Sequence, residues 1–216
     1  MQADQAHEEV WPILVKTGIY DDLKGVIDIH CHPNPDFCAR LLDDTDLVAI
    51  AKAVGMRGLV MKSHFSATHE RAYLAEKTVG GGINVFGLLC LNPSVGGFRP
   101  ETVRIAIAQG VRAIWMPSMW AENHASYVRH EGHGMGYQTI GMNFPPAGEG
   151  LTILDANGVM KDEVKDILDQ VAAADLMLAT GHLNDPKRQN MLGEAKTRGN
   201  TKSLDPTPNK QVSKNH

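Results

Sequence analysis

The sequence predicts an α/β fold in which parallel strands alternate with helices, and three observations predict it. Short runs of β-branched and other apolar residues recur along the chain. Segments with apolar residues at helical spacing lie between these runs. The connections between the two kinds of segment are short for most of the chain. This alternation is typical of a parallel sheet with right-handed crossovers, either a barrel or a doubly wound sheet.

Each predicted element has its own local justification. The first strand is an apolar, β-branched run that ends before Pro33 and Pro35, which do not continue a central strand. The first helix has Leu47, Ile50 and Val54 on one face, aspartates at its start and a glycine at its end. The same reasoning predicts strands at 26–31, 57–65, 83–92, 111–117 and 176–183, and helices at 43–55, 68–79, 100–110, 161–174 and 185–200.

The remaining segments define the expected domain organisation. We expect residues 1–200 to form a single α/β domain and residues 201–216 to form a polar, disordered tail. Residues 117–150 have little apolar periodicity and predict a long functional loop. Asn157 and Gly158 predict the turn of a β-hairpin over 151–163. About five strand-helix units are visible, whereas a closed barrel needs eight, so the sequence predicts an incomplete barrel if it is a barrel.

Composition limits the classes of partner. The chain has 216 residues, of which 43% are hydrophobic, and a formal net charge of −4. No block of Lys and Arg indicates nucleic acid or an anionic membrane surface, so we expect a small-molecule partner. The first residues predict neither a signal peptide nor a membrane span, and we expect a cytoplasmic protein. The three cysteines have no CxxC spacing, so we expect reduced thiols, with Cys31 as a small buried residue.

The first candidate site residues are two histidines at the end of the first strand. His30 and His32 fall on one face because side chains alternate along a strand, whereas Cys31 falls on the other. Two imidazoles about 7 Å apart along one face can share a divalent metal ion. Asp28 falls on the same face of the strand as the two histidines, and we expect it either to orient one of the rings or to cap a loop.

Later strands repeat this arrangement. Lys62 and His64 share a parity at the end of the second strand, and His182 follows the fifth strand after a glycine. A buried lysine needs a carboxylate, a substrate anion or conversion to a carbamate. Three strands that each bring a histidine to the same end of a sheet predict a common site, with His182 as a third metal ligand.

Three other residues are candidates for substrate binding. Arg99 follows a glycine pair after the third strand and is expected to meet an anionic group of the substrate. Trp120 lies near the end of the fourth strand and is expected to form either a pocket wall or part of the core. His124 follows closely and is expected to reach the mouth of the site.

Five motifs together resemble a known family. The stretches DIHCHPNP, GLVMKSHF, IWMPSMWAENH, GLTILDANG and LATGHL resemble an amidohydrolase-superfamily barrel, and more narrowly an uncharacterised amidohydrolase-like subgroup. The likeness covers residues 18 to 199. It implies a TIM-barrel-like fold and a site with one or two metal ions, most often zinc, with manganese or iron as alternatives. By analogy His30, His32 and His182 are metal ligands, and Lys62 resembles a bridging carbamylated lysine.

The resemblance also implies a reaction. We expect a hydrolase that cleaves an amide, ester or lactone bond of a small molecule through a metal-bound hydroxide, with Lys62 and His64 as catalytic residues. A decarboxylase or lyase of the same fold is the alternative. The chain lacks a recognisable late strand that ends in the expected aspartate, which favours a truncated barrel that only binds metal. An unclosed sheet edge of that kind favours weak stability or a homo-oligomer.

Overall fold

The computed structural model describes residues 21–131 and 149–205, and the side chains within 127–131 are not described. The chain divides into two compact units according to its internal contacts. Unit 1 contains residues 1–89 and 108–112, and unit 2 contains residues 90–107 and 113–216. Each unit is described by itself below.

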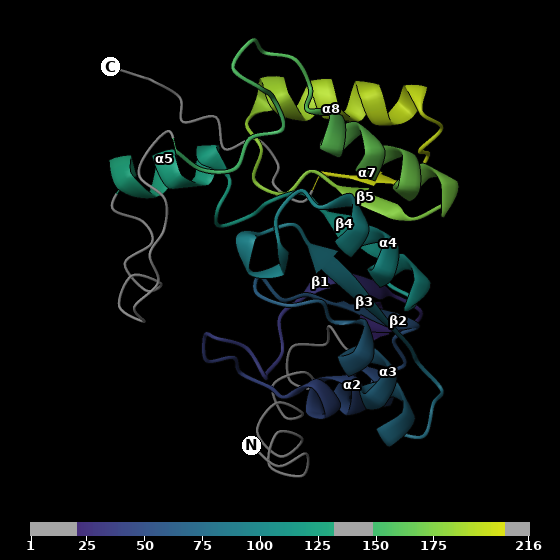
Figure 1. The fold of residues 1–216 in the computed structure, drawn as a ribbon. Helices are drawn as coiled ribbons and strands as arrows, with labels where there is room; N and C mark the ends of the chain where they lie inside the picture. The colour runs from purple at the N-terminus through teal and green to yellow at the C-terminus, as the bar shows by residue number, and fades with distance from the viewer. Residues whose placement is uncertain (1–20, 132–148, 206–216) are drawn as a thin grey trace. The chain divides into compact units, whose positions relative to one another are not determined.

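Unit 1 is a parallel sheet with helices packed along it (Figure 1). Its strands are β1 (Ile27–Cys31), β2 (Gly58–Met61) and β3 (Asn84–Cys90), the last of which ends one residue inside unit 2. Strand β1 pairs with β2, and β2 pairs with β3, both in parallel. A short 3-10 helix, η1 (Asp21–Leu23), precedes β1. Helices α2 (Asp44–Ala53) and α3 (His69–Thr78) connect the strands.

The core of unit 1 explains why these segments fold as they do. Strand β2 is buried along its whole length, as expected for an apolar strand with neighbours on both sides. Helices α2 and α3 contribute their small and branched residues to the same core. The buried residues of this core are Val48, Ala51, Leu59, Met61, Ala72, Ala75, Ile83 and Val85.

Unit 2 repeats the strand-helix alternation. Its strands β4 (Ala113–Trp115), β5 (Met177–Ala179) and β6 (Ser203–Leu204) pair in parallel in that order. Its other elements are η2 (Pro93–Val95), α4 (Pro100–Ala108), whose last residue belongs to unit 1, α5 (Glu122–Glu131), α7 (Asp162–Ala173) and α8 (Asp185–Thr197). Helices α7 and α8 lie side by side in Figure 1 and contact each other.

Helix α7 shows how an amphipathic sequence anchors unit 2. Val164, Ile167, Leu168 and Val171 are fully buried, and their spacing of three or four residues places them on one face. Burying such side chains contributes about 2 kcal/mol each. This apolar face, together with the buried strands β4 and β5, forms the core of the unit.

The predicted fold class is confirmed. Parallel strands alternate with helices in both units, which is the repeat of a TIM-barrel-like α/β protein. Within the described residues there are six strands, fewer than the eight of a closed barrel. No helix of the described residues is long and apolar enough to cross a membrane.

Three local predictions need correction. The predicted loop 117–150 contains helix α5, and among the side chains of this helix that the structure describes, Ala125 is the buried one. The predicted hairpin 151–163 has its turn, with Gly158 at φ 77°, but only one antiparallel bridge, Leu154 to Met160. The side chain of Asp155 builds this turn by accepting hydrogen bonds from the backbone of Asn157 and Val159.

The third correction concerns the predicted tail. Ser203–Leu204 forms strand β6, because the backbone on either side of it pairs with β5. Leu178 N donates to Lys202 O at 2.8 Å, and Thr180 N donates to Leu204 O at 3.0 Å. A strand of two residues gains its stability from these long-range bonds, so its own sequence carries little signal. Residues 206–216 lie outside the described residues.

Candidate functional site

The candidate site of unit 1 lies where strands β1 and β2 end. Cys31 at the end of β1 is in register with Met61 at the end of β2, and Lys62 N donates to Cys31 O at 2.8 Å. His32 and Lys62 therefore follow neighbouring parallel strands at the same sheet edge. This is the edge at which α/β proteins place their ligand sites.

Three nitrogen atoms converge at this edge. His30 Nε2 lies 3.2 Å from His32 Nε2, and Lys62 Nζ lies 3.2 Å from His30 Nε2. The prediction that the two histidines share a face is confirmed by this contact. His64 is buried and stacks on His32, with ring centroids 4.7 Å apart. We call these four residues, His30, His32, Lys62 and His64, the strand-end cluster.

Electrostatics keep the two histidines neutral. His30 keeps part of its surface exposed, and its partial burial, followed by the Lys62 charge, lowers its pKa to about 4. Burial also lowers the pKa of His32 to about 3, with further contributions from Lys62 and Arg40. At neutral pH each ring is therefore uncharged and has one nitrogen with a lone pair, which is the form that binds a metal ion.

The separation of the two Nε2 atoms fits a shared metal ion. Two ligands of a tetrahedral zinc ion with bonds of 2.0–2.1 Å lie about 3.3 Å apart, and the structure has 3.2 Å. Arg40 Nη2 lies 3.4 Å from His32 Nδ1. If His32 binds a metal ion through Nε2, its ring proton lies on Nδ1, and the contact with the Arg40 donor must then loosen. Among the described residues, no three His, Cys, Asp or Glu side chains are grouped so that they could hold a metal ion.

Asp28 and Cys31 do not join the convergent nitrogens. Asp28 Oδ1 accepts a hydrogen bond from the backbone N of His30 at 2.8 Å within strand β1, and its predicted roles of orienting a ring or capping a loop stay predictions. Cys31 Sγ donates to Val60 O at 3.2 Å and packs against the core. Burial raises the pKa of Cys31 to about 12, so the thiol stays protonated at neutral pH, but the side chain is half-buried where a buried one was predicted.

A second histidine pair lies in unit 2. His182 follows β5 after Gly181, whose positive φ of 59° allows the sharp turn. His182 Nδ1 lies 2.9 Å from His124 Nδ1, and Asn123 Nδ2 donates to His182 O at 3.2 Å. Burial lowers the pKa of His124 to about 4. The structure thus places the predicted ligand His182 beside the predicted substrate residue His124.

The other predicted substrate residues have simpler surroundings in unit 2. Arg99 is exposed, and its aliphatic stem lies against Gly96 before helix α4. Trp120 is half-buried, and its carbonyl accepts a hydrogen bond from Leu151 N at 2.6 Å. Their roles as substrate contacts stay predictions.

Sequence reasoning missed a buried polar network in unit 2. Asn92 follows β3, Ser118 follows β4, and both side chains are fully buried. Asn92 Nδ2 donates to Ser118 Oγ at 2.9 Å, and Ser118 N donates to Asn92 Oδ1 at 3.0 Å. Cys90 Sγ lies 3.3 Å from Ser118 Oγ. The available signal was their position, since each follows directly after the apolar run of a strand.

An aspartate follows the last strand of unit 2, although the sequence predicts no late strand that ends in an aspartate. Asp205 follows strand β6 directly. Its carboxylate accepts a hydrogen bond from Thr180 Oγ1 at 3.1 Å and pairs with Arg188, whose Nε lies 3.2 Å away. As with Asn92, the signal was a polar residue directly after a strand. It could not be used for Asp205, because β6 was not predicted as a strand.

With this geometry in hand, the chain can be compared with known proteins. The family model described as "Family of unknown function (DUF6282)" matches residues 25–215. The chain belongs to the DUF6282 family. No curated protein matches this DUF6282 chain. Among solved structures, it is similar to the tetrameric deoxyribose phosphate aldolase from Aeropyrum pernix, with 19% identity, 86% of this chain and 78% of that chain covered, and a TM-score of 0.33.

Proposed function

We propose that this chain is a metal-dependent hydrolase that cleaves an amide, ester or lactone bond of a small molecule. The observation that carries the proposal is the pair of neutral imidazoles with their Nε2 atoms 3.2 Å apart, next to a buried lysine. Neutral nitrogen donors at this separation are suited to zinc, and manganese or iron are alternatives. The resemblance of the motifs to the amidohydrolase superfamily supports the same reaction.

The strand-end cluster supplies the protein groups that this reaction needs. His30 and His32 would hold the metal ion through Nε2. The role of His182 as a metal ligand stays a prediction from the sequence. A bound divalent ion would supply Lewis-acid polarisation of a carbonyl group and a nucleophilic hydroxide near neutral pH. His64 packs its ring on His32 and so restricts the orientation of that ligand.

Lys62 is the group proposed to stabilise negative charge. Its side chain is fully buried, and its Nζ lies beside His30 at the sheet edge. A cation in such a place has a strong interaction with charge that develops nearby, because little water screens it. We propose that Lys62 donates a hydrogen bond to the carbonyl oxygen of the substrate as that oxygen becomes negative.

Metal analysis of a matched set of variants tests the proposal. We expect the wild-type chain to carry about one or two equivalents of a transition metal, measured by plasma mass spectrometry. The His30→Ala, His32→Ala double variant should lose this metal. His69→Gln is the control, because His69 is a half-buried histidine of the same unit outside the strand-end cluster. It should retain the metal.

The outcomes separate the hydrolase from its alternatives. Folded wild-type protein that takes up no metal, even after zinc is added, would contradict the proposal. If metal is bound through the cluster, a screen of amides, esters and lactones in isotopically labelled water follows. Incorporation of solvent oxygen into the product indicates hydrolysis, whereas release of carbon dioxide without it indicates a decarboxylase.

A further inference from the structure

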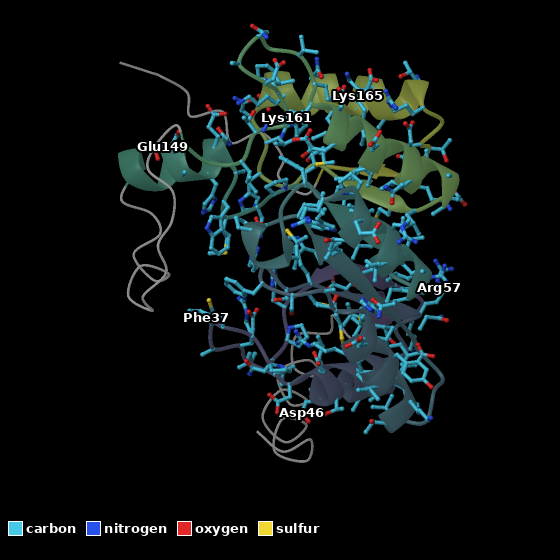
Figure 2. The ribbon with its side chains drawn as sticks, in the orientation of Figure 1. Phe37, Asp46, Arg57, Glu149, Lys161 and Lys165 are labelled. Carbon is cyan, nitrogen blue, oxygen red and sulfur yellow. The ribbon has the colours of Figure 1, made fainter. Side chains whose placement is uncertain are left out.

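An exposed phenylalanine lies on the loop that follows the first histidine pair. Phe37 belongs to the segment 33–42 between β1 and α2 in unit 1, and 56% of its surface is exposed. Figure 2 shows it on the outer part of that loop. Its ring contacts that of Phe65, with centroids 5.4 Å apart. Phe65 is half-buried, so Phe37 extends an aromatic surface that begins inside the fold.

The loop that carries Phe37 is held by specific bonds. The side chain of Asn34 donates to Arg40 O at 3.0 Å and accepts from Arg40 N at 3.2 Å. Arg40 also pairs with Asp36 across the loop, with Nη2 2.7 Å from Oδ2. These bonds fix both flanks of the tip, so Phe37 is held in its exposed position by the loop structure. A preorganised apolar ring loses little entropy when a ligand covers it.

The two phenylalanines are continuous with the strand-end cluster. Phe65 meets His64 edge-on with centroids 6.0 Å apart, and His64 stacks on His32 at 4.7 Å. A row of rings therefore leads from Phe37 to the convergent nitrogens. A flat apolar group that packs on Phe65 and Phe37 would lie beside the reacting part of the site.

We propose that Phe37 and Phe65 recognise an aromatic ring of the substrate. The inference rests on the proposed function and adds the substrate class, a small molecule that carries an aromatic ring next to a carbonyl or carboxylate group. The ring would pack on the two phenylalanines. The oxygen atoms of the adjacent group would accept hydrogen bonds from Lys62, the buried amine of the cluster. Phe37 and Phe65 are thus specificity residues, which contact the substrate away from the bond that is cleaved.

Another exposed aromatic residue in the same unit serves as a control. Tyr73 on helix α3 is 63% exposed, close to the value for Phe37. Its ring lies near Lys77 Nζ, 5.7 Å from the centroid, and it is not part of the row of rings. Replacing Tyr73 by alanine removes a similar exposed area without altering the proposed recognition surface.

Calorimetric titration with benzoate and acetate tests the proposal on the full chain. Both probes carry a carboxylate, and only benzoate carries an aromatic ring. We expect wild-type protein to bind benzoate at least about tenfold more tightly than acetate, and Phe37→Ala to reduce this preference about fivefold. Tyr73→Ala should keep the wild-type preference. Circular dichroism of each variant would establish that it is folded.

Two results would overturn the inference. One is a preference for benzoate that is the same in Phe37→Ala as in wild type, and the other is no benzoate binding to the folded wild-type protein at millimolar concentration. Each titration is made with and without added zinc, while metal content is measured separately. Zinc bound by the cluster without a benzoate preference refutes only the aromatic recognition. A benzoate preference lost in Phe37→Ala, in protein that takes up no zinc, refutes only the metal-dependent hydrolase.

Discussion

The two units bring histidines together in chemically different surroundings. In unit 1, the neutral rings of His30 and His32 face the buried amine of Lys62 at the end of two neighbouring strands. In unit 2, His182 contacts His124, which lies in the first turn of helix α5. The uncharged residues Asn92 and Ser118 follow β3 and β4 in this unit.

The two groups of residues differ in the chemistry that their side chains provide. In unit 2 the Asn92 side chain donates to the Ser118 hydroxyl and accepts from the Ser118 backbone N, so the clearest contribution of this pair is to join the segments that follow β3 and β4. The strand-end cluster of unit 1 instead brings two imidazole nitrogens and the Lys62 amine together at one point. That combination is what metal binding and stabilisation of negative charge require.

The largest loss of stability is expected from substituting one glycine in each unit. A methyl group on Gly87 would lie 2.2 Å from the backbone N of His69, and one on Gly181 would lie 2.4 Å from Met116 O. We expect Gly87→Ala and Gly181→Ala each to lower the free energy of unfolding by about 3 kcal/mol, since backbone atoms must move. Urea denaturation followed by circular dichroism measures this change.

Gly193→Ala provides the matched control for these substitutions. Gly193 lies inside helix α8, and a methyl group there meets no atom within 4 Å. This variant should be more stable than wild type by about 0.5–1 kcal/mol because alanine has the higher helix propensity. Wild-type stability in Gly87→Ala or Gly181→Ala would contradict the close backbone approach in the respective unit.

A smaller effect is expected from the buried polar network of unit 2. Ser118→Ala removes the hydroxyl that accepts from Asn92 Nδ2 and leaves the buried amide without this bond. We expect the free energy of unfolding to fall by about 2 kcal/mol. Ser126→Ala is the control, because its half-buried hydroxyl only donates to Glu122 O within helix α5, and its effect should stay within about 0.5 kcal/mol. Equal effects of the two variants would show that the network does not stabilise the strand ends.

The smallest expected effect is a change with pH in the free energy of unfolding, caused by His124 of unit 2. Burial lowers the pKa of His124 to about 4, below the value of about 6.5 for an unfolded histidine. Between these pH values the unfolded chain binds a proton that the folded chain excludes, so stability falls as the pH decreases. From about pH 7 to about pH 5, wild type should lose about 1 kcal/mol more than His124→Asn, after allowance for partial exposure.

This comparison is made by thermal and urea denaturation of metal-free protein in the presence of a chelator. His124→Asn keeps a polar side chain of similar size but has no group that titrates in this range. A parallel loss of stability in both proteins would show that the pair in unit 2 is not what makes the fold sensitive to acid.

The sequence predicted the parts of the site that depend on local regularity. The parity rule placed His30 and His32 on one face, and the prolines placed them near the end of β1. It did not predict α5, because the described first turns of that helix bury only the small side chain of Ala125 and are supported by contacts such as the bond from Asn123 to the backbone of His182. Strand β6 escaped for a similar reason, since its two residues are held by the edge of β5.

By itself the sequence determined the alternation of strands and helices and the strand ends at which the histidines and Lys62 lie. Both follow from the periodicity of side chains along one segment, which is a property of neighbouring residues. Only the tertiary structure decided which of these residues meet. The approach of Lys62 to His30, of His124 to His182 and of Ser118 to Asn92 joins segments 26 to 58 residues apart. Such contacts depend on strand register and on packing across the fold, and no local pattern encodes them.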